Sequence, residues 1–187
     1  DEIKFISKYD LNNIEDIPDG SEFYITGVFA VIKRKLDKKN QTMVTCFLDT
    51  LAGSVEAIIF SSVYDKFRDL IFDNNIVYVY GRLDKQYSSK FTVQKIFPAD
   101  TGFGDIISKI NVLINWAAPD DRIIESINNI LVSMPKGNTK IFVSLKIEEN
   151  NYAVIKPEAN QLRINYNFIS NLETIVGQGN IKIEFNN

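Results

Sequence analysis

The sequence predicts a five-stranded β-barrel with one inserted helix, followed by a small α+β unit. Over residues 22–100, short runs rich in Val, Ile and Phe are separated by turn signals. One helical stripe interrupts these runs between the third and the fourth. After residue 104 the strands alternate with longer helical stripes. The chain has 187 residues and is 45% hydrophobic, which is enough for one or two buried cores.

Residues 1–21 predict a short helical segment that leads into the barrel. Their apolar positions follow the spacing of an amphipathic helix: Ile3, Phe5, Ile6, Tyr9 and Leu11. A turn signal, Pro18-Asp19-Gly20, ends the segment.

Five strands and a helix are expected in residues 22–100. The strands should lie at about 22–33, 43–49, 54–60, 76–84 and 90–97, with a polar loop from Arg34 to Thr42. Ser61-Ser62 can cap a helix that carries its apolar side chains on one stripe, at Val63, Phe67, Leu70 and Ile71. Five strands with a helix between the third and the fourth is the order of an OB-fold barrel.

A linker is expected at residues 98–104, and a separate α+β unit at residues 105–187. A strand at 110–116 should be followed by a helix that begins at Pro119-Asp120-Asp121 and stops at Pro135-Lys-Gly137. A hairpin around 148–151, a short strand at 162–165, a second helix ending at Gly177 and a strand at 181–185 complete the unit.

The composition argues against catalysis by this stretch of chain. It has no His and one Cys, which excludes Ser-His-Asp and Cys-His nucleophiles and zinc sites built from Cys or His. No phosphate-binding glycine loop is present, and the acidic pairs at 120–121 and 148–149 suit solvated turns. We expect no catalytic residues, no metal and no cofactor.

Two basic loops of the barrel predict a binding site for single-stranded nucleic acid. The first loop holds Lys33, Arg34, Lys35, Lys38 and Lys39. The second holds Lys85, Tyr87 and Lys90. In OB barrels these two loops flank the binding face, where cations follow the phosphates and rings stack on bases. The alternative is that the lysines only solubilise the loops.

Alternation along the second strand places Val44, Cys46 and Leu48 in the core and Phe47 on the outer face. An outward ring either stacks on a base or packs on a neighbouring domain. By the same alternation Arg82 faces outward, where it meets either a phosphate or an acid across the sheet.

Several short blocks occur in a fixed order along the barrel: Gly27-Val28, Leu51-Ala-Gly53-Ser54-Val55-Glu56, Ile59-Phe60, Asn75-Ile76-Val77 and Gly81-Arg82-Leu83-Asp84. They resemble the OB domain of the alpha subunit of bacterial DNA polymerase III. The following blocks resemble the C-terminal domain of that family: Asn129-Ile130-Leu131, Pro135-Lys-Gly137, Ile141-Phe-Val143 and Val176-Gly177. The sequence departs from the family where the usual aromatic is Thr45 and the usual acid is Thr50.

The resemblance implies a replicative DNA-directed DNA polymerase, a nucleotidyltransferase, whose catalytic domains lie upstream. It implies that the OB domain binds single-stranded template DNA and that the C-terminal domain binds the clamp-loader tau subunit. The closing segment with Ile183 and Phe185 is similar to a peptide that some members offer to the sliding clamp, and a plain edge strand is the other interpretation. The chain lacks an initiator Met, so we expect a piece of a longer protein.

Residues 105–187 should bind protein rather than DNA, because their cations are spread singly along the chain. We expect an exposed apolar rim around Trp116, Ile124 and Phe168. Two other functions remain open: an anticodon-binding domain of a class II tRNA synthetase, and a pure protein-interaction module. No signal peptide or membrane-spanning run is evident, so a cytoplasmic location without a membrane partner is expected.

Overall fold

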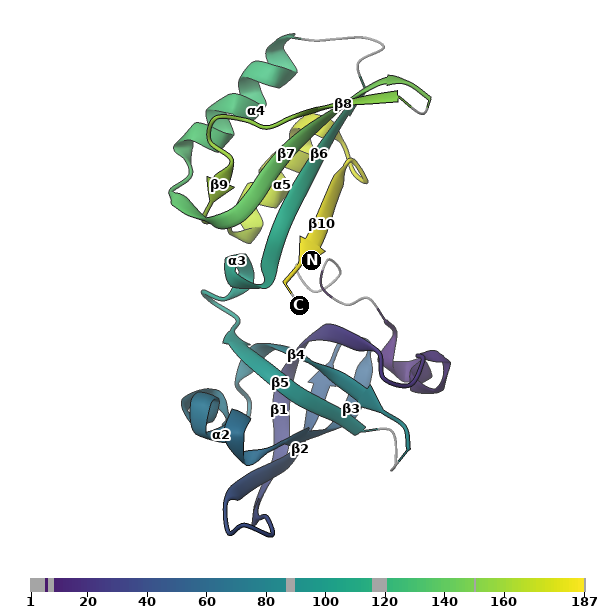
Figure 1. Cartoon of the computed structure of the whole chain (residues 1–187), viewed down its shortest axis with the longest axis vertical. Coiled ribbons are helices and arrows are strands. Elements are labelled where there is room, and N and C mark those ends of the chain that lie inside the picture. The colour runs from purple at the N-terminus through teal and green to yellow at the C-terminus, as the bar shows by residue number, and fades with distance from the viewer. Residues whose placement is uncertain (1–5, 7–8, 87–89, 116–120, 150, 187) are drawn as a thin grey trace. The chain divides into compact units, whose positions relative to one another are not determined.

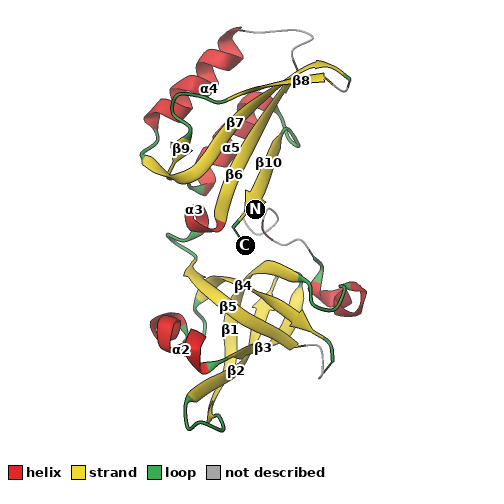
Figure 2. Ribbon diagram, in the orientation of Figure 1, coloured by secondary structure: helices red, strands yellow, loops and turns green. Residues whose placement is uncertain are grey.

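A computed structural model describes the chain except residues 1–5, 7–8, 87–89, 116–120, 150 and 187 (Figure 1). The chain divides into two compact units, residues 1–100 and residues 101–187. Each unit has its own sheet. The helices of the first unit are short, and the second unit also contains longer ones (Figure 2).

The first unit is a closed barrel with the strand order β1-β2-β3-β5-β4. Its strands are β1 (Glu22–Leu36), β2 (Thr42–Thr50), β3 (Gly53–Ile59), β4 (Ile76–Asp84) and β5 (Lys90–Pro98). The helix α2 (Ser61–Phe67) and the 3-10 turn η2 (Arg68–Leu70) lie between β3 and β4. β1 closes the barrel because it pairs with β2 along one edge and with β4 along the other. The expected OB fold is confirmed.

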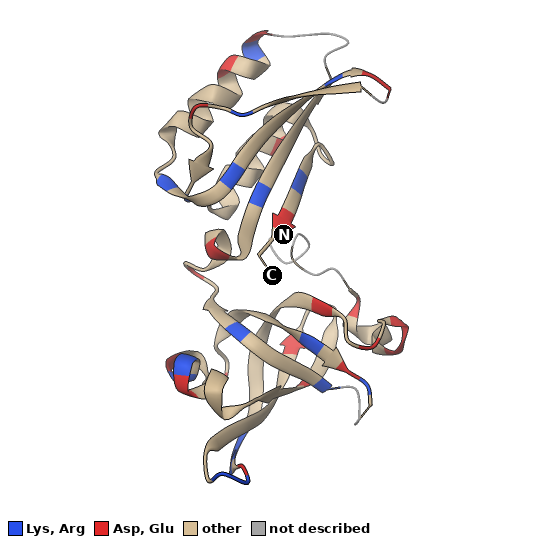
Figure 3. Ribbon diagram, in the orientation of Figure 1, with Lys and Arg blue, Asp and Glu red and all other residues tan. Residues whose placement is uncertain are grey.

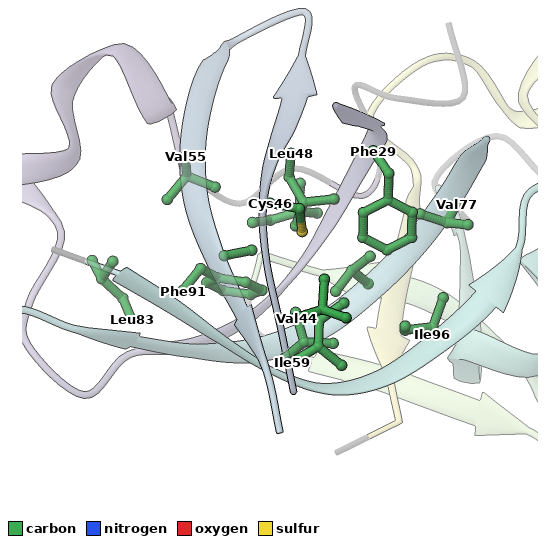
Figure 4. Packing of buried hydrophobic residues seen from close by; sticks show 14 of the residues in the cluster. Phe29, Val44, Cys46, Leu48, Val55, Ile59, Val77, Leu83, Phe91 and Ile96 are labelled. Carbon is green, nitrogen blue, oxygen red and sulfur yellow. The ribbon is translucent and has the colours of Figure 1, made fainter. Parts of the chain in front are cut away.

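The barrel core is built by one side of each strand. Val44 and Leu48 have no exposed surface, and Cys46, which lies between them in the sequence, is also buried. Alternation along the strand predicted all three positions. Figure 4 shows their side chains directed into the barrel with Phe29 and Phe91. Burying each such side chain contributes about 1.5–3 kcal/mol, so this core is the main source of the unit's stability.

Most of the expected amphipathic helix before the barrel, at residues 1–5 and 7–8, lies outside the described residues. After it the chain forms the 3-10 turn η1 (Leu11–Asp16), which Asp10 caps by accepting the backbone N–H of Asn12. Leu11 and Ile17 are buried in the barrel core. The segment therefore completes the barrel core.

The first loop is also shorter than expected. β1 continues to Leu36, so the backbone of Lys33, Arg34 and Lys35 lies in a strand, and only the turn at residues 37–41 joins it to β2. The ladder between β1 and β2 shifts register between Ala30 and Lys33, where Val31 has a φ of 52°. This β-bulge marks the start of a hairpin arm, residues 32–43, that projects from the barrel (Figure 1).

The second unit is an α+β unit, as expected. Its sheet has the order β10-β6-β7-β8, with β9 beside β7. The strands are β6 (Ile107–Asn115), β7 (Lys136–Glu148), β8 (Asn151–Ile155), β9 (Gln161–Leu162) and β10 (Ile181–Phe185). β6 and β7 are parallel and are joined across α4 (Asp121–Ser133), while α3 (Phe103–Ile106) precedes β6. α5 (Tyr166–Val176) contacts α4 and packs on β6 and β10.

Candidate nucleic-acid interface

One continuous row of residues crosses the outer face of the barrel. Residues paired directly between neighbouring strands point to the same side of a sheet. Following the strand register from β1 through β2, β3, β5 and β4, the row is Lys33, Thr45, Ile58, Thr92 and Arg82. These five residues include two cations, one at each end, and beyond Arg82 the register continues to Glu22 of β1.

A second row lies beside the first and carries the outward ring. Ala30 pairs with Phe47 and Phe47 with Glu56. The Glu56 carboxylate accepts a hydrogen bond from the Lys90 ammonium at 2.7 Å, and Lys90 pairs in register with Asp84 of β4. Phe47 is 41% exposed, so the prediction that its ring faces outward is confirmed. The two rows together place cations and a ring on one face.

The tip of the arm carries further positive charge, shown in blue in Figure 3. The Asp37 carboxylate accepts the backbone N–H groups of Lys39 (2.8 Å) and Gln41 (2.9 Å), which fixes the turn. The side chains of Lys33, Lys35, Lys38 and Lys39 are exposed, and none forms an ion pair with an acid among the described residues. These four lysines can therefore meet phosphates without breaking an existing contact.

Arg34 points away from this face. It pairs with Val44, whose side chain lies in the core, and its Nη2 donates to the backbone carbonyl of Ile71 at 3.1 Å. Strand alternation separates Arg34 from its neighbours Lys33 and Lys35. The structure thus sets Arg34 apart from the other cations of the arm, because its guanidinium anchors the arm to the segment before β4.

The second basic loop offers less free charge than expected. Lys85 donates through Nζ to the Glu15 carbonyl oxygen and through its backbone N–H to the Asp19 carboxylate, so it ties the segment before β1 to the end of β4. Lys90 is engaged by Glu56. Tyr87 lies outside the described residues.

Arg82 lies in a groove of about 400 Å³ that Phe60, Thr92 and Gln94 also line. Phe60 is 49% exposed, so the groove offers a ring and a cation, and its lining also holds two acids, Asp19 and Asp84. Arg82 also pairs in register with Glu22, an acid across the sheet. The pKa of Glu22 is lowered mainly by a hydrogen bond from Gln94, then by one from Tyr80, and to a lesser extent by the charge of Arg82.

Sequence reasoning missed Glu56, Ile58, Phe60 and Thr92. Alternation along β3, whose inward residues are Val55, Ala57 and Ile59, would have placed Glu56 and Ile58 outside. The contact of Glu56 with Lys90 depends on β5 lying beside β3, which alternation within one strand does not reveal.

The residues expected to bind protein are only partly on the surface. Ile124 of α4 is 39% exposed and lines an apolar cavity of about 160 Å³ with Ile114, Ile127 and Ile155. The expectation that Phe168 lies on an exposed rim is wrong, since it is 2% exposed in the first turn of α5, where that helix packs on the sheet. Ile183 and Phe185 are half-buried in β10, which pairs with β6. Trp116 lies outside the described residues.

Across the described part of the chain, no group of three or more acids or Cys could hold a metal ion. The described helices are also too short or too polar for any of them to cross a membrane.

No protein-family model matches the chain. Over 188 residues it is 20% identical to DNA polymerase III subunit alpha of Buchnera aphidicola, a match that covers 97% of this chain and 16% of the relative. This chain resembles part of DNA polymerase III subunit alpha. A 23% match over 124 residues to the Aquifex aeolicus subunit covers 65% of this chain and 11% of that protein. The resemblance stated from the sequence blocks is thus confirmed, and the chain spans less than a fifth of each of these alpha subunits.

Two similar solved structures each align with less than half of the chain. The mitochondrial single-stranded DNA binding protein Rim1 of S. cerevisiae aligns over 44% of this chain and 96% of its own, with a TM-score of 0.36 and 13% identity. The second OB-fold domain of replication protein A from Methanococcus maripaludis aligns over 47% and 93%, with a TM-score of 0.37 and 17% identity.

Proposed function

We propose that the chain is a non-catalytic part of a replicative DNA polymerase, in which the barrel binds single-stranded template DNA and the second unit binds the clamp-loader tau subunit. The observation that carries the first half is the row from Lys33 to Arg82, which has a cation at each end, with Phe47 and Phe60 beside it. Cations in a row can follow a phosphate backbone, and exposed rings give bases a surface for stacking.

The second half of the proposal is supported by the partly exposed Ile124 and the apolar cavity that it lines. The similarity to DNA polymerase III subunit alpha favours tau as the partner over an unrelated protein. The half-buried position of β10 against β6 favours the edge-strand interpretation of Ile183 and Phe185 over a peptide free to bind the sliding clamp.

Fluorescence anisotropy with a labelled oligothymidine of about 15 nucleotides tests the barrel. We expect single strands to bind in preference to duplex, weakly, because one small barrel contacts few phosphates. With three or four phosphates contacted, log K should fall against log salt with a slope of about −2 to −3. An affinity that does not change with salt contradicts the proposal and favours a pure protein-interaction module.

A further inference from the structure

We propose that Glu56 limits the DNA affinity of the barrel by holding Lys90 away from the phosphates. This inference rests on the proposed single-strand binding by the same face. It concerns how tightly that face grips the strand, and it assigns Glu56 a role that opposes binding.

The position of Glu56 puts its carboxylate inside the candidate interface. Glu56 is the cross-strand partner of Phe47, so the carboxylate stands beside the ring on the outer face. Its Oε1 lies 2.7 Å from Lys90 Nζ, and the side chains of Lys90 and Glu56 are 27% and 36% exposed. This is a charge-assisted hydrogen bond between partly shielded groups, which is stronger than a fully exposed ion pair.

The other neighbour of Lys90 is also acidic. On β4 the residue in register with it is Asp84. Lys90 is therefore flanked by a carboxylate on each neighbouring strand, whereas Lys33 and Lys35 stand exposed on the arm with no acid paired to them among the described residues. The second row presents no net positive charge to a phosphate, and the first row does.

A phosphate that recruits Lys90 has to break this contact. It would also leave the Glu56 carboxylate uncompensated close to the DNA, which repels the strand. While Lys90 stays paired with Glu56, it adds nothing to the number of counterions released on binding. The DNA strand is then bound only by the first row and the rings. Such weak binding suits a template that must move along the face.

Glu56→Gln in the full chain tests the inference, because Gln keeps the size and the hydrogen-bond acceptor and removes the charge. With labelled oligothymidine at several salt concentrations, we expect the affinity to rise about threefold to tenfold at low salt. The slope of log K against log salt should steepen by about 0.7, the value for one more phosphate contact by a single strand.

Asp69→Asn is the matched control, since it changes the net charge equally. Its side chain is 95% exposed on η2, lies 3.8 Å from the Arg68 guanidinium and belongs to neither row, so the variant also releases a cation outside the rows. Its affinity should stay within about twofold of the wild type. An equal rise in both variants would show a general charge effect and overturn the role of Glu56.

A double-variant comparison shows whether the effect runs through Lys90. Lys90→Ala should weaken binding, because it leaves Glu56 unpaired, and adding Glu56→Gln should restore an affinity close to that of the wild type. If the wild type binds DNA and Glu56→Gln leaves affinity and slope unchanged, the ion pair only links β3 to β5 and the inference fails alone. If the wild type does not bind single strands, the proposed function fails together with it.

Discussion

Cys46 and Phe47 are neighbours in β2 whose side chains meet opposite environments. Cys46 is 2% exposed, and desolvation, followed by the charges of Asp73 and Glu56, raises its pKa to about 12. Phe47 is 41% exposed on the outer face. Alternation along a single strand was sufficient to predict both positions, because one face of β2 is uniformly apolar.

Phe47→Ala should weaken binding of single-stranded DNA about tenfold, since stacking of one base on a ring contributes roughly 1–3 kcal/mol. The melting temperature should change little, because the ring is exposed. Leu51→Ala, at an 83% exposed position in the turn after β2, is the control for loss of an exposed apolar side chain. Equal affinity of Phe47→Ala and the wild type would assign the ring to contact with another protein.

The buried thiol makes stability depend on alkaline pH. The pKa of Cys46 is about 12 in the folded barrel and lies near 9 when the chain is unfolded. The neutral thiol is favoured by folding, so this contribution is complete below about pH 9 and is lost as pH rises toward 12. Burial raises the pKa of Tyr24 to about 12 as well, which acts in the same direction.

Denaturant unfolding at a series of pH values should therefore show a falling free energy of unfolding above pH 9. Cys46→Ala should reduce that slope, although the smaller side chain lowers stability at neutral pH. A slope that is identical in the variant would mean that the thiol ionises equally in both states.

At the scale of elements, the hairpin arm is where sequence and structure differ most. The sequence favoured a polar loop from Arg34 onward, because residues 33–39 show no apolar alternation. The structure continues β1 to Leu36, because residues 33–36 pair with β2, and these four residues are exposed on both faces of the strand. A strand that is solvated on both sides lacks the period-2 signal from which strands are recognised.

The strand geometry of the arm predicts which of its lysines contribute most to DNA affinity. Replacing Lys33 and Lys35 together by Ala should weaken DNA binding and make the salt slope shallower by about 1.4, because both stand on the face of Phe47. Replacing Lys38 and Lys39 should have a smaller effect, since they lie in the turn beyond the paired strands. Each exposed lysine contributes within about 0.5 kcal/mol to stability, so the melting temperatures should agree.

A large drop in the melting temperature of either pair of variants would mean that these lysines support the fold. A larger loss of affinity for the turn pair would move the binding face from the barrel toward the tip of the arm.

At the scale of the whole molecule, the sequence predicted the order of a barrel and an α+β unit because the hydrophobic pattern changes after residue 104. It did not reveal that Leu11 and Ile17 belong to the barrel core, because the apolar spacing up to Leu11 fits a helix and does not show which core these residues join. The sequence also did not predict the contacts of Lys85 with Glu15 and Asp19, since these contacts join residues about 70 positions apart.

Deleting residues 101–187 should abolish tau binding in a pull-down and leave the DNA affinity of the barrel within about twofold. The barrel has a core formed by its own residues, from Leu11 to Ile96, so the shortened chain should stay folded. Circular dichroism of the shortened chain is the control. If it keeps tau and loses DNA, the proposed division of tasks between the two units is reversed.

The bulge at Val31 determines which deletion β1 can tolerate without a change in register. From Ala30 to Lys33 the chain advances three residues while β2 advances only two, from Phe47 to Thr45. A chain without Val31 would pair Ile32 with Cys46 and still bring Lys33 opposite Thr45, so the same lysines would face outward. Such a chain would also lose a β-branched residue held at a φ of 52°, a conformation that costs about 1–3 kcal/mol. The additional residue therefore gives the arm its bend, and the lysines would keep their direction without it.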